Sequence, residues 1–185
     1  MKRQSGFTLV ELMVVIGILT ILLLIGMPSY QYITNSYRMS AESNNLLGDL
    51  QYARGEALRQ GQPVTVCVSA NGTSCSGANT WQVGWVVYSN PTGAAANPPA
   101  GSILHVQQAF TGTNPDTFVS NSGITSVSYN REGFATTNAG FPNTLIVLHN
   151  SPTSNSVWTR CLWITPIGLA SIQTNANNSS GMACL

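Results

Sequence analysis

Charged side chains are scarce in this chain. Only 7% of its 185 residues are Asp, Glu, Lys or Arg, whereas soluble proteins typically contain about 25%. Lys2 is the only lysine, and seven basic against six acidic residues leave a formal net charge of +1. Because phosphate contacts dominate the affinity of proteins for DNA and RNA, this composition disfavours a nucleic-acid-binding surface. Disorder is disfavoured too, since 43% of the residues are hydrophobic and disordered chains combine high charge with few aromatic residues.

Sequence motifs of common enzymes and metal sites are also missing. The chain has no Cys-x-x-Cys pair, no Gly-x-Ser-x-Gly elbow, no phosphate-binding glycine loop and no His-Glu-x-x-His. We therefore expect no cofactor, no metal site and no enzymatic activity. His105 and His149 lie in strand-like runs, and we interpret both as half-buried sheet residues. A cysteine nucleophile beside one of them is the catalytic arrangement that the composition leaves open.

The N-terminal part contains a long uncharged stretch instead. Residues 12–37 include no charged side chain, and Lys2 and Arg3 precede them. This is the charge order of a segment that inserts with its N-terminus in the cytoplasm. Residues 7–27 are long enough for a membrane anchor, since about 20 helical residues span a bilayer core. No Ala-x-Ala cleavage element follows, in contrast to an ordinary secretory signal.

Glu11 is an acid at the beginning of this apolar run. A charge at the centre of a membrane helix costs about 2.5–3.5 kcal/mol, less near the interface, and such acids usually have a partner. A cut between Gly6 and Phe7 would supply one, because the new α-ammonium of Phe7 would lie on the same helix face as Glu11. The same cut would remove Lys2 and Arg3 and leave no lysine in the chain.

Residues 2–12, with the sequence KRQSGFTLVEL, resemble the class III signal of type IV pilins and type II secretion pseudopilins. The resemblance implies cleavage between Gly6 and Phe7 by prepilin peptidase, followed by N-methylation of Phe7. It also implies that Glu11 pairs with the N-terminal amine of a neighbouring subunit during filament assembly. Pro28 stands where the family has a helix-bending proline, in keeping with the helical hydrogen bond that proline removes.

Residue spacing predicts that the helix continues beyond the apolar run. Apolar side chains recur at three- and four-residue intervals up to about Gln60, after which Gly61 and Pro63 are expected to end the helix. One stripe can then pack on a sheet. The charged residues expected to face outward are Arg38, Glu42, Asp49 and Arg59.

From Pro63 onward, apolar and polar residues alternate with a period of two, which is typical of strands. The strand-like runs are 64–68, 81–88, 103–110, 126–129, 144–149, 157–164 and 169–173. No second helix is predicted. The expected fold class is α+β, with a long N-terminal helix, half transmembrane, packed on an antiparallel β-sheet head as in type IV pilins. The expected segments are a leader peptide (1–6), the transmembrane and assembly half of the helix (7–30), its amphipathic half (31–61) and a β-rich globular head (62–185).

Two blocks, residues 50–67 and 81–88, are similar to the GspH/FimT group, which includes GspH-type pseudopilins and the minor pilins FimU and FimT. Segment 129–133 is similar to the strand and turn before the final hairpin of that group. Major pilins usually lack the first block, so the resemblance implies a minor subunit near the tip of a type IV pilus or a type II secretion pseudopilus. The implied partners are prepilin peptidase, other pilins or pseudopilins and the bacterial inner membrane, with the head in the periplasm before assembly.

DNA binding is the alternative function, since FimT-type members of the group capture DNA during natural transformation. Their binding element is a Gly-Arg-x-Arg stretch in the C-terminal hairpin. The matching place here is residues 168–171, Gly-Leu-Ala-Ser, where both arginines are missing. Arg131 and Arg160 remain as candidate phosphate contacts in the head. We therefore expect a structural role rather than DNA uptake.

Four cysteines in an exported head are expected to form two disulfides, with three alternative connectivities. We favour Cys67–Cys75, which closes a short loop, and Cys161–Cys184, which ties the polar C-terminal tail back to a strand.

Overall fold

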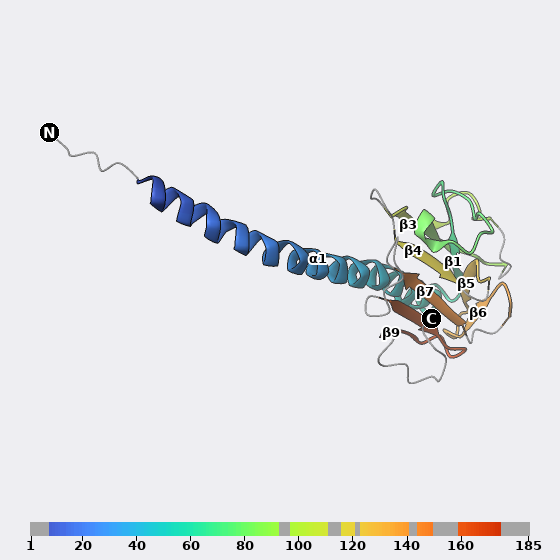
Figure 1. The fold of residues 1–185 in the computed structure, drawn as a ribbon. Coiled ribbons are helices and arrows are strands. Elements are labelled where there is room, and N and C mark those ends of the chain that lie inside the picture. Colours follow the sequence, from blue (N-terminus) through green and yellow to red (C-terminus); the bar gives the residue numbers. More distant parts are fainter. Residues whose placement is uncertain are drawn as a thin grey trace. The chain divides into compact units, whose positions relative to one another are not determined.

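The computed structural model describes residues 8–92, 97–110, 116–120, 123–140, 144–149 and 159–174 of the chain. In chain order the elements are α1 (Leu9–Gln60), β1 (Val64–Val68), the 3₁₀ turn η1 (Trp81–Val83), β2 (Gly84–Ser89), β3 (Ile103–Gln108), β4 (Thr117–Ser120), β5 (Ser126–Tyr129), β6 (Ala135–Thr137), β7 (Thr144–His149), β8 (Arg160–Ile164) and β9 (Ala170–Thr174). One long helix followed by antiparallel strands confirms the α+β class (Figure 1).

Helix α1 ends where the sequence predicts, at Gln60. The backbone amide of Gly61 donates a hydrogen bond to the carbonyl oxygen of Ala57 at 3.0 Å, which closes the last turn. Pro63 follows shortly after and has no amide hydrogen with which to extend the helix.

The chain divides into two compact units, Met1–Tyr37 and Arg38–Leu185. The first unit includes the N-terminal part of α1, and the second includes the rest of α1 together with the strands named above. The helical stretch from Arg38 onward is therefore part of the head, because its buried side chains pack in one core with those of the strands. The sequence prediction places the start of the head later, at residue 62, where the period-two alternation of strands begins.

The strands form two antiparallel sheets. The larger sheet has the order β3-β2-β1-β5-β6, and the smaller has the order β4-β7-β8-β9. An isolated bridge between Thr80 and Val119 connects the chain before η1 to β4. The short strands β4 and β6 are not among the predicted strands, because three or four residues are too few to show a clear alternation.

The core of the head lies between α1 and both sheets. The fully buried residues contributed by α1 are Met39, Leu46, Leu50, Ala53 and Ala57. They form one cluster with residues of the strands β1, β4, β7 and β8, including Val66, Phe118, Ile146 and Leu162. The predicted apolar stripe of the helix therefore packs against two sheets at once.

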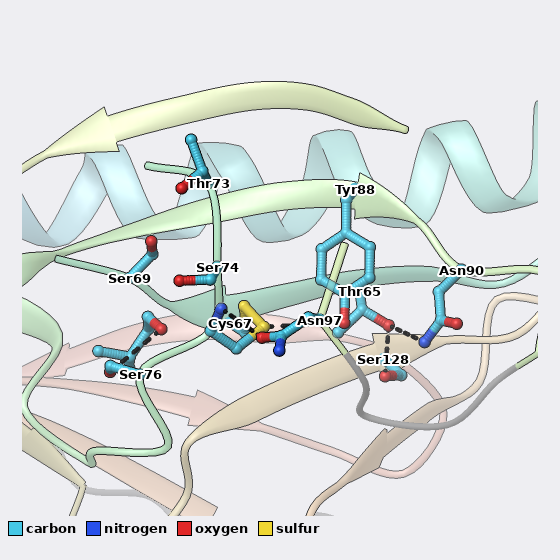
Figure 2. The surroundings of a disulfide bond; sticks show 12 residues. Thr65, Cys67, Ser69, Thr73, Ser74, Ser76, Tyr88, Asn90, Asn97 and Ser128 are labelled. Carbon is cyan, nitrogen blue, oxygen red and sulfur yellow. Dashed lines mark hydrogen bonds between the residues drawn. A yellow bond between two sulfur atoms is a disulfide. The ribbon is translucent and has the colours of Figure 1, made fainter. Parts of the chain in front are cut away.

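The opposite face of β1 is covered as well. Every residue of β1 is buried, including Thr65 and Cys67. The Cys67–Cys75 disulfide, with a Cα–Cα distance of 5.6 Å, holds the following loop to this face (Figure 2). Beside it, the hydroxyl oxygens of Thr65 and Ser128 lie 2.7 Å apart, and Asn90 Nδ2 donates to Thr65 Oγ1 at 3.1 Å. These hydrogen bonds satisfy polar groups that would otherwise be buried without partners.

Candidate functional site

The N-terminal half of α1 presents an uncovered apolar surface. Most large apolar side chains of residues 9–33 are half or more exposed, for example Leu24 at 73% and Ile25 at 67%. By length and composition this helix could cross a membrane. Glu11 lies in its first turn, where a negative charge suits the positive end of the helix dipole. The Glu11 amide donates to Thr8 Oγ1 at 3.3 Å, so that Thr8 caps the helix.

The predicted processing site, between Gly6 and Phe7, lies outside the described residues. Cleavage there, N-methylation of Phe7 and pairing of Glu11 with an amine therefore stay predictions. Helix α1 continues through position 28. The side chain of Pro28 is not among those described, so the kink stays a prediction too.

In the head, α1 makes a partly buried ion pair that is not apparent from the sequence. Arg38 donates two hydrogen bonds to the Asp116 carboxylate, from Nε to Oδ2 at 2.8 Å and from Nη2 to Oδ1 at 3.0 Å. Asp116 directly precedes β4, and its side chain is fully buried. The prediction that Glu42 and Asp49 face outward is wrong, because both are half-buried against the head. Arg38 is 41% exposed as well as paired with Asp116. Arg59 does face solvent, paired with Glu56.

Glu42 lies beside this ion pair with a half-buried carboxyl group. Its Oε2 atom has no hydrogen-bond partner among the described residues. Burial, and next the Asp116 carboxylate, raise the pKa of Glu42 from 4.5 to about 7, while Arg38 acts in the opposite direction. Below that pH the protonated Glu42 can donate to Asp116, whereas above it two carboxylates share one guanidinium group.

We expect the head to be more stable at pH 5 than at pH 8. A carboxyl group whose pKa rises on folding contributes stability below its unfolded pKa and loses it as the pH rises through the folded value. Because Glu42 is only half-buried, solvent screening reduces the effect to about 1–2 kcal/mol. The Glu42→Gln variant keeps a donor toward Asp116 but cannot ionise, and it should flatten the difference. Thermal unfolding of the full chain in detergent at both pH values measures this; an undiminished difference in the variant would contradict the assignment.

Asp49 joins α1 to two strands of the larger sheet. Trp85 Nε1 donates to Asp49 Oδ2 at 2.7 Å, and His105 Nδ1 lies 3.0 Å from Asp49 Oδ1. The His105 side chain is 47% exposed, so it is half-buried as predicted but has a partner that the sequence does not reveal. The side chain of His149 is not among those described. Within the ranges that the structure describes, no group of three or more His, Cys, Asp or Glu could hold a metal ion.

Arg54 holds two turns of the head against α1. Its Nε donates to the Gly133 carbonyl oxygen at 3.1 Å, and its Nη2 donates to the Ile167 carbonyl oxygen at 3.2 Å. Gly133 and Gly168 have φ angles of +82° and +80°. A Cβ atom on Gly168 would overlap the Gly133 carbonyl oxygen. Arg54 thus joins segment 129–133 to the turn between β8 and β9 at one point on the helix.

Comparison with known proteins identifies the family. A family model described as type II transport protein GspH matches residues 42–168, well over half of the chain. The chain belongs to the GspH family. A second model, the prokaryotic N-terminal methylation motif, matches residues 1–27 of this GspH-family chain.

The GspH-family chain is also similar to individual pilus proteins. It is 68% identical over 31 residues to prepilin peptidase-dependent protein D of Escherichia coli K12, covering 17% of this chain and 21% of that protein. It is 37% identical over 76 residues to fimbrial protein Q of Moraxella bovis, covering 40% of this chain and 46% of that protein. The chain therefore spans less than half the length of these curated relatives.

Two crystal structures of the type IV minor pilin FimU of Pseudomonas aeruginosa share the fold of this GspH-family chain. One, in space group P65, is 17% identical with a TM-score of 0.55, covering 79% of this chain and 99% of FimU. The other, in space group P21, is 16% identical with a TM-score of 0.60, covering 83% and 99%. At these identities the likeness supports the pilin-type fold alone.

The two arginines considered for DNA lie apart in this GspH-family chain. Arg131 follows β5 and pairs with Glu132 at 2.7 Å. Arg160 begins β8, whereas the opposite end of that strand leads to the turn held by Arg54. Arg160 thus lies at the end of β8 opposite the turn that contacts Gly133, and Arg131 has an acidic neighbour as its partner. Residues 168–171, at the end of that turn and the start of β9, contain no basic side chain.

The first of the two disulfides predicted for the GspH-family head, Cys67–Cys75, is present. Its loop is held further by the Cys75 amide, which donates to Asn97 Oδ1 at 3.1 Å (Figure 2). Cys161 is buried in β8 and disulfide-bonded. Cys184 lies outside the described residues, and the Cys161–Cys184 pairing stays a prediction.

Proposed function

We propose that this chain is a minor pilin or pseudopilin, a structural subunit near the tip of a type IV pilus or a type II secretion pseudopilus. The observation that carries the proposal is the uncovered apolar surface over residues 9–33 of α1, with Glu11 in its first turn. Such a surface is stable only in lipid or against other apolar helices. Membership of the GspH family and the N-terminal methylation motif support the same role.

The proposed mechanism is assembly without chemistry on a substrate. Prepilin peptidase cuts between Gly6 and Phe7, and Phe7 is then methylated. Before assembly the chain is anchored in the bacterial inner membrane with its head in the periplasm. During assembly the helix leaves the bilayer and packs among the helices of other pilins or pseudopilins. Glu11 and the amine of a neighbouring subunit neutralise each other where both are away from water.

Co-purification of the tagged full chain from sheared surface filaments and from membranes tests this role. A pilin partner would place the chain in a pilus, and a secretion-system partner would place it in a pseudopilus. The matched control is Gly6→Val, which removes the small residue before the cut and should keep the chain in the membrane. Recovery of the unaltered chain from the membrane alone, without another pilin or pseudopilin, would contradict the proposal.

A further inference from the structure

A groove of about 300 Å³ on the head has one arginine as the charged residue of its described lining. We call it the Arg54 groove. From α1 it is lined by Gln51, Arg54, Gly55 and Leu58, and from the turn before β9 by Leu169. Its volume is at the lower limit of small-molecule sites, which enclose about 300–1,000 Å³. The Arg54 groove therefore suits one or two residues of an extended peptide rather than a helix or a folded domain.

Arg54 has no carboxylate partner among the residues that the structure describes. A guanidinium group has five N–H donors. Here Nε donates to the Gly133 carbonyl oxygen and Nη2 to the Ile167 carbonyl oxygen, and both acceptors are uncharged. The arginines of the described head that do pair with a carboxylate are Arg38, Arg59 and Arg131. Arg54 thus keeps further donors, and a positive charge that no described residue neutralises.

Apolar side chains lie beside this charge. Leu58 and Leu169 line the groove and are 52% and 54% exposed. Phe134 and Ile167, at the two turns that Arg54 holds, are 48% and 54% exposed. Apolar surroundings strengthen hydrogen bonds to a charged group, and they also favour burial of an apolar group of the ligand. The combination predicts a ligand in which a carboxylate is joined to an apolar group.

A C-terminal carboxylate meets this requirement better than an acidic side chain within a peptide. In an extended chain successive side chains point to opposite faces, so an internal acidic residue and its apolar neighbour do not both enter one small groove. The last residue of a chain instead carries its carboxylate and its side chain on the same Cα atom. Capture of a terminal carboxylate is also a recurrent mode of peptide recognition.

We propose that the Arg54 groove binds the C-terminus of a partner protein whose last residue is apolar. The terminal carboxylate accepts hydrogen bonds from Arg54, and the last side chain packs against Leu58 and Leu169. Gln51 supplies an amide group that can donate to, or accept from, the backbone of the bound peptide. This inference does not depend on the proposed function, because no step of it requires a filament.

Peptide binding to the full chain in lipid nanodiscs is the test. The probe is an Ala-Ala-Leu peptide with an uncharged fluorescent label at its N-terminus and a free C-terminal carboxylate. The control is the same peptide with a C-terminal amide. Fluorescence anisotropy should show binding at least about tenfold tighter for the carboxylate, because hydrogen bonds to charged groups are the stronger ones.

A competing carboxylate in the groove provides a second measurement that leaves Arg54 in place. A Cβ atom at Gly55 would meet no atom within 4 Å, and glutamate is a better helix former than glycine, so Gly55→Glu should fold. It should bind the carboxylate peptide at least about tenfold more weakly than the uncharged variant Gly55→Gln, because like charges repel. Gly48→Glu is the matched control. Gly48 lies about two helical turns earlier, is equally open and is outside the groove lining, so this variant should bind as the unaltered chain does.

Three results would overturn the assignment. The first is equal binding, or no binding, of the carboxylate and amide peptides. The second is equally tight binding of an amidated peptide with an internal Asp-Leu pair, which would assign the groove to acidic side chains. The third is an equal loss of binding in Gly48→Glu and Gly55→Glu. Incorporation into a filament is measured separately by co-purification, so each of these results would leave the proposed function standing.

Discussion

Replacing Glu11 with alanine is expected to leave the chain inserted and processed but to abolish its entry into a filament. Glu11 lies in the first turn of a helix whose surface is apolar. In a filament its carboxylate would be away from water, where only an oppositely charged group makes it tolerable. Removing one member of a buried ion pair costs about 3–5 kcal/mol, so the incorporated fraction should fall by about 100-fold or more. Immunoblots of sheared filaments and of membranes measure it.

Two further variants separate the charge of Glu11 from its effect on the helix start. Thr8-x-x-Glu11 has the sequence of a capping box, and the Glu11 amide donates to Thr8 Oγ1. Glu11→Gln keeps the capping pattern without the charge, and should fail to assemble as Glu11→Ala does. Thr8→Ala weakens the cap by about 1 kcal/mol but keeps the charge, and should still assemble. Normal incorporation of Glu11→Gln would contradict the proposed pairing with an amine.

The extent of α1 and most strands can be predicted because they depend on local patterns. Apolar spacing and a Gly-x-Pro stop define the end of the helix at Gln60. Period-two alternation locates β1, β5 and β7 at the observed residues. The run 81–88 is only partly correct, because the chain forms a 3₁₀ turn at Trp81–Val83 before β2 begins. There Trp81 is fully buried and its indole donates to the Ile124 carbonyl oxygen at 3.1 Å.

The contacts between distant residues cannot be predicted in the same way. Arg38 and Asp116 are 78 positions apart, and nothing in the spacing of charges along α1 indicates which of them has a partner in the head. The one available signal is that charged residues are scarce in the head. The head beyond the helix contains only Asp116, Arg131, Glu132 and Arg160 as charged residues, so each is a candidate partner for a charge on the helix. The same reasoning fails for Arg54, because its acceptors are backbone carbonyl oxygens.

Most of the few charged residues on this part of α1 make contacts within the head. Arg38 contacts the residue before β4, Asp49 contacts β2 and β3, and Arg54 contacts two turns. These contacts fix elements of the head to the helix, whereas Arg59 of the same helix faces solvent and pairs with Glu56.

Gly168→Ala should be among the most destabilising single substitutions in the head. Two effects add at this position. The φ angle of +80° disfavours any residue with a Cβ atom, at a cost of about 1–2 kcal/mol. The added Cβ would also overlap the Gly133 carbonyl oxygen and lie 3.0 Å from Arg54 Nε, which would push the two turns apart and break the hydrogen bonds that Arg54 donates. We expect a total loss of about 3–5 kcal/mol in the free energy of unfolding.

Gly101→Ala is the matched control for this prediction. Gly101 has a similar φ angle of +74°, but a Cβ atom there would meet no atom within 4 Å. It should therefore cost only the conformational part, about 1–2 kcal/mol. Thermal unfolding of the full chain in detergent should show a melting temperature about 10 °C below that of the unaltered chain for Gly168→Ala and a clearly smaller decrease for Gly101→Ala. Equal decreases in the two variants would mean that the contact among Gly168, Gly133 and Arg54 does not hold the turns to the helix.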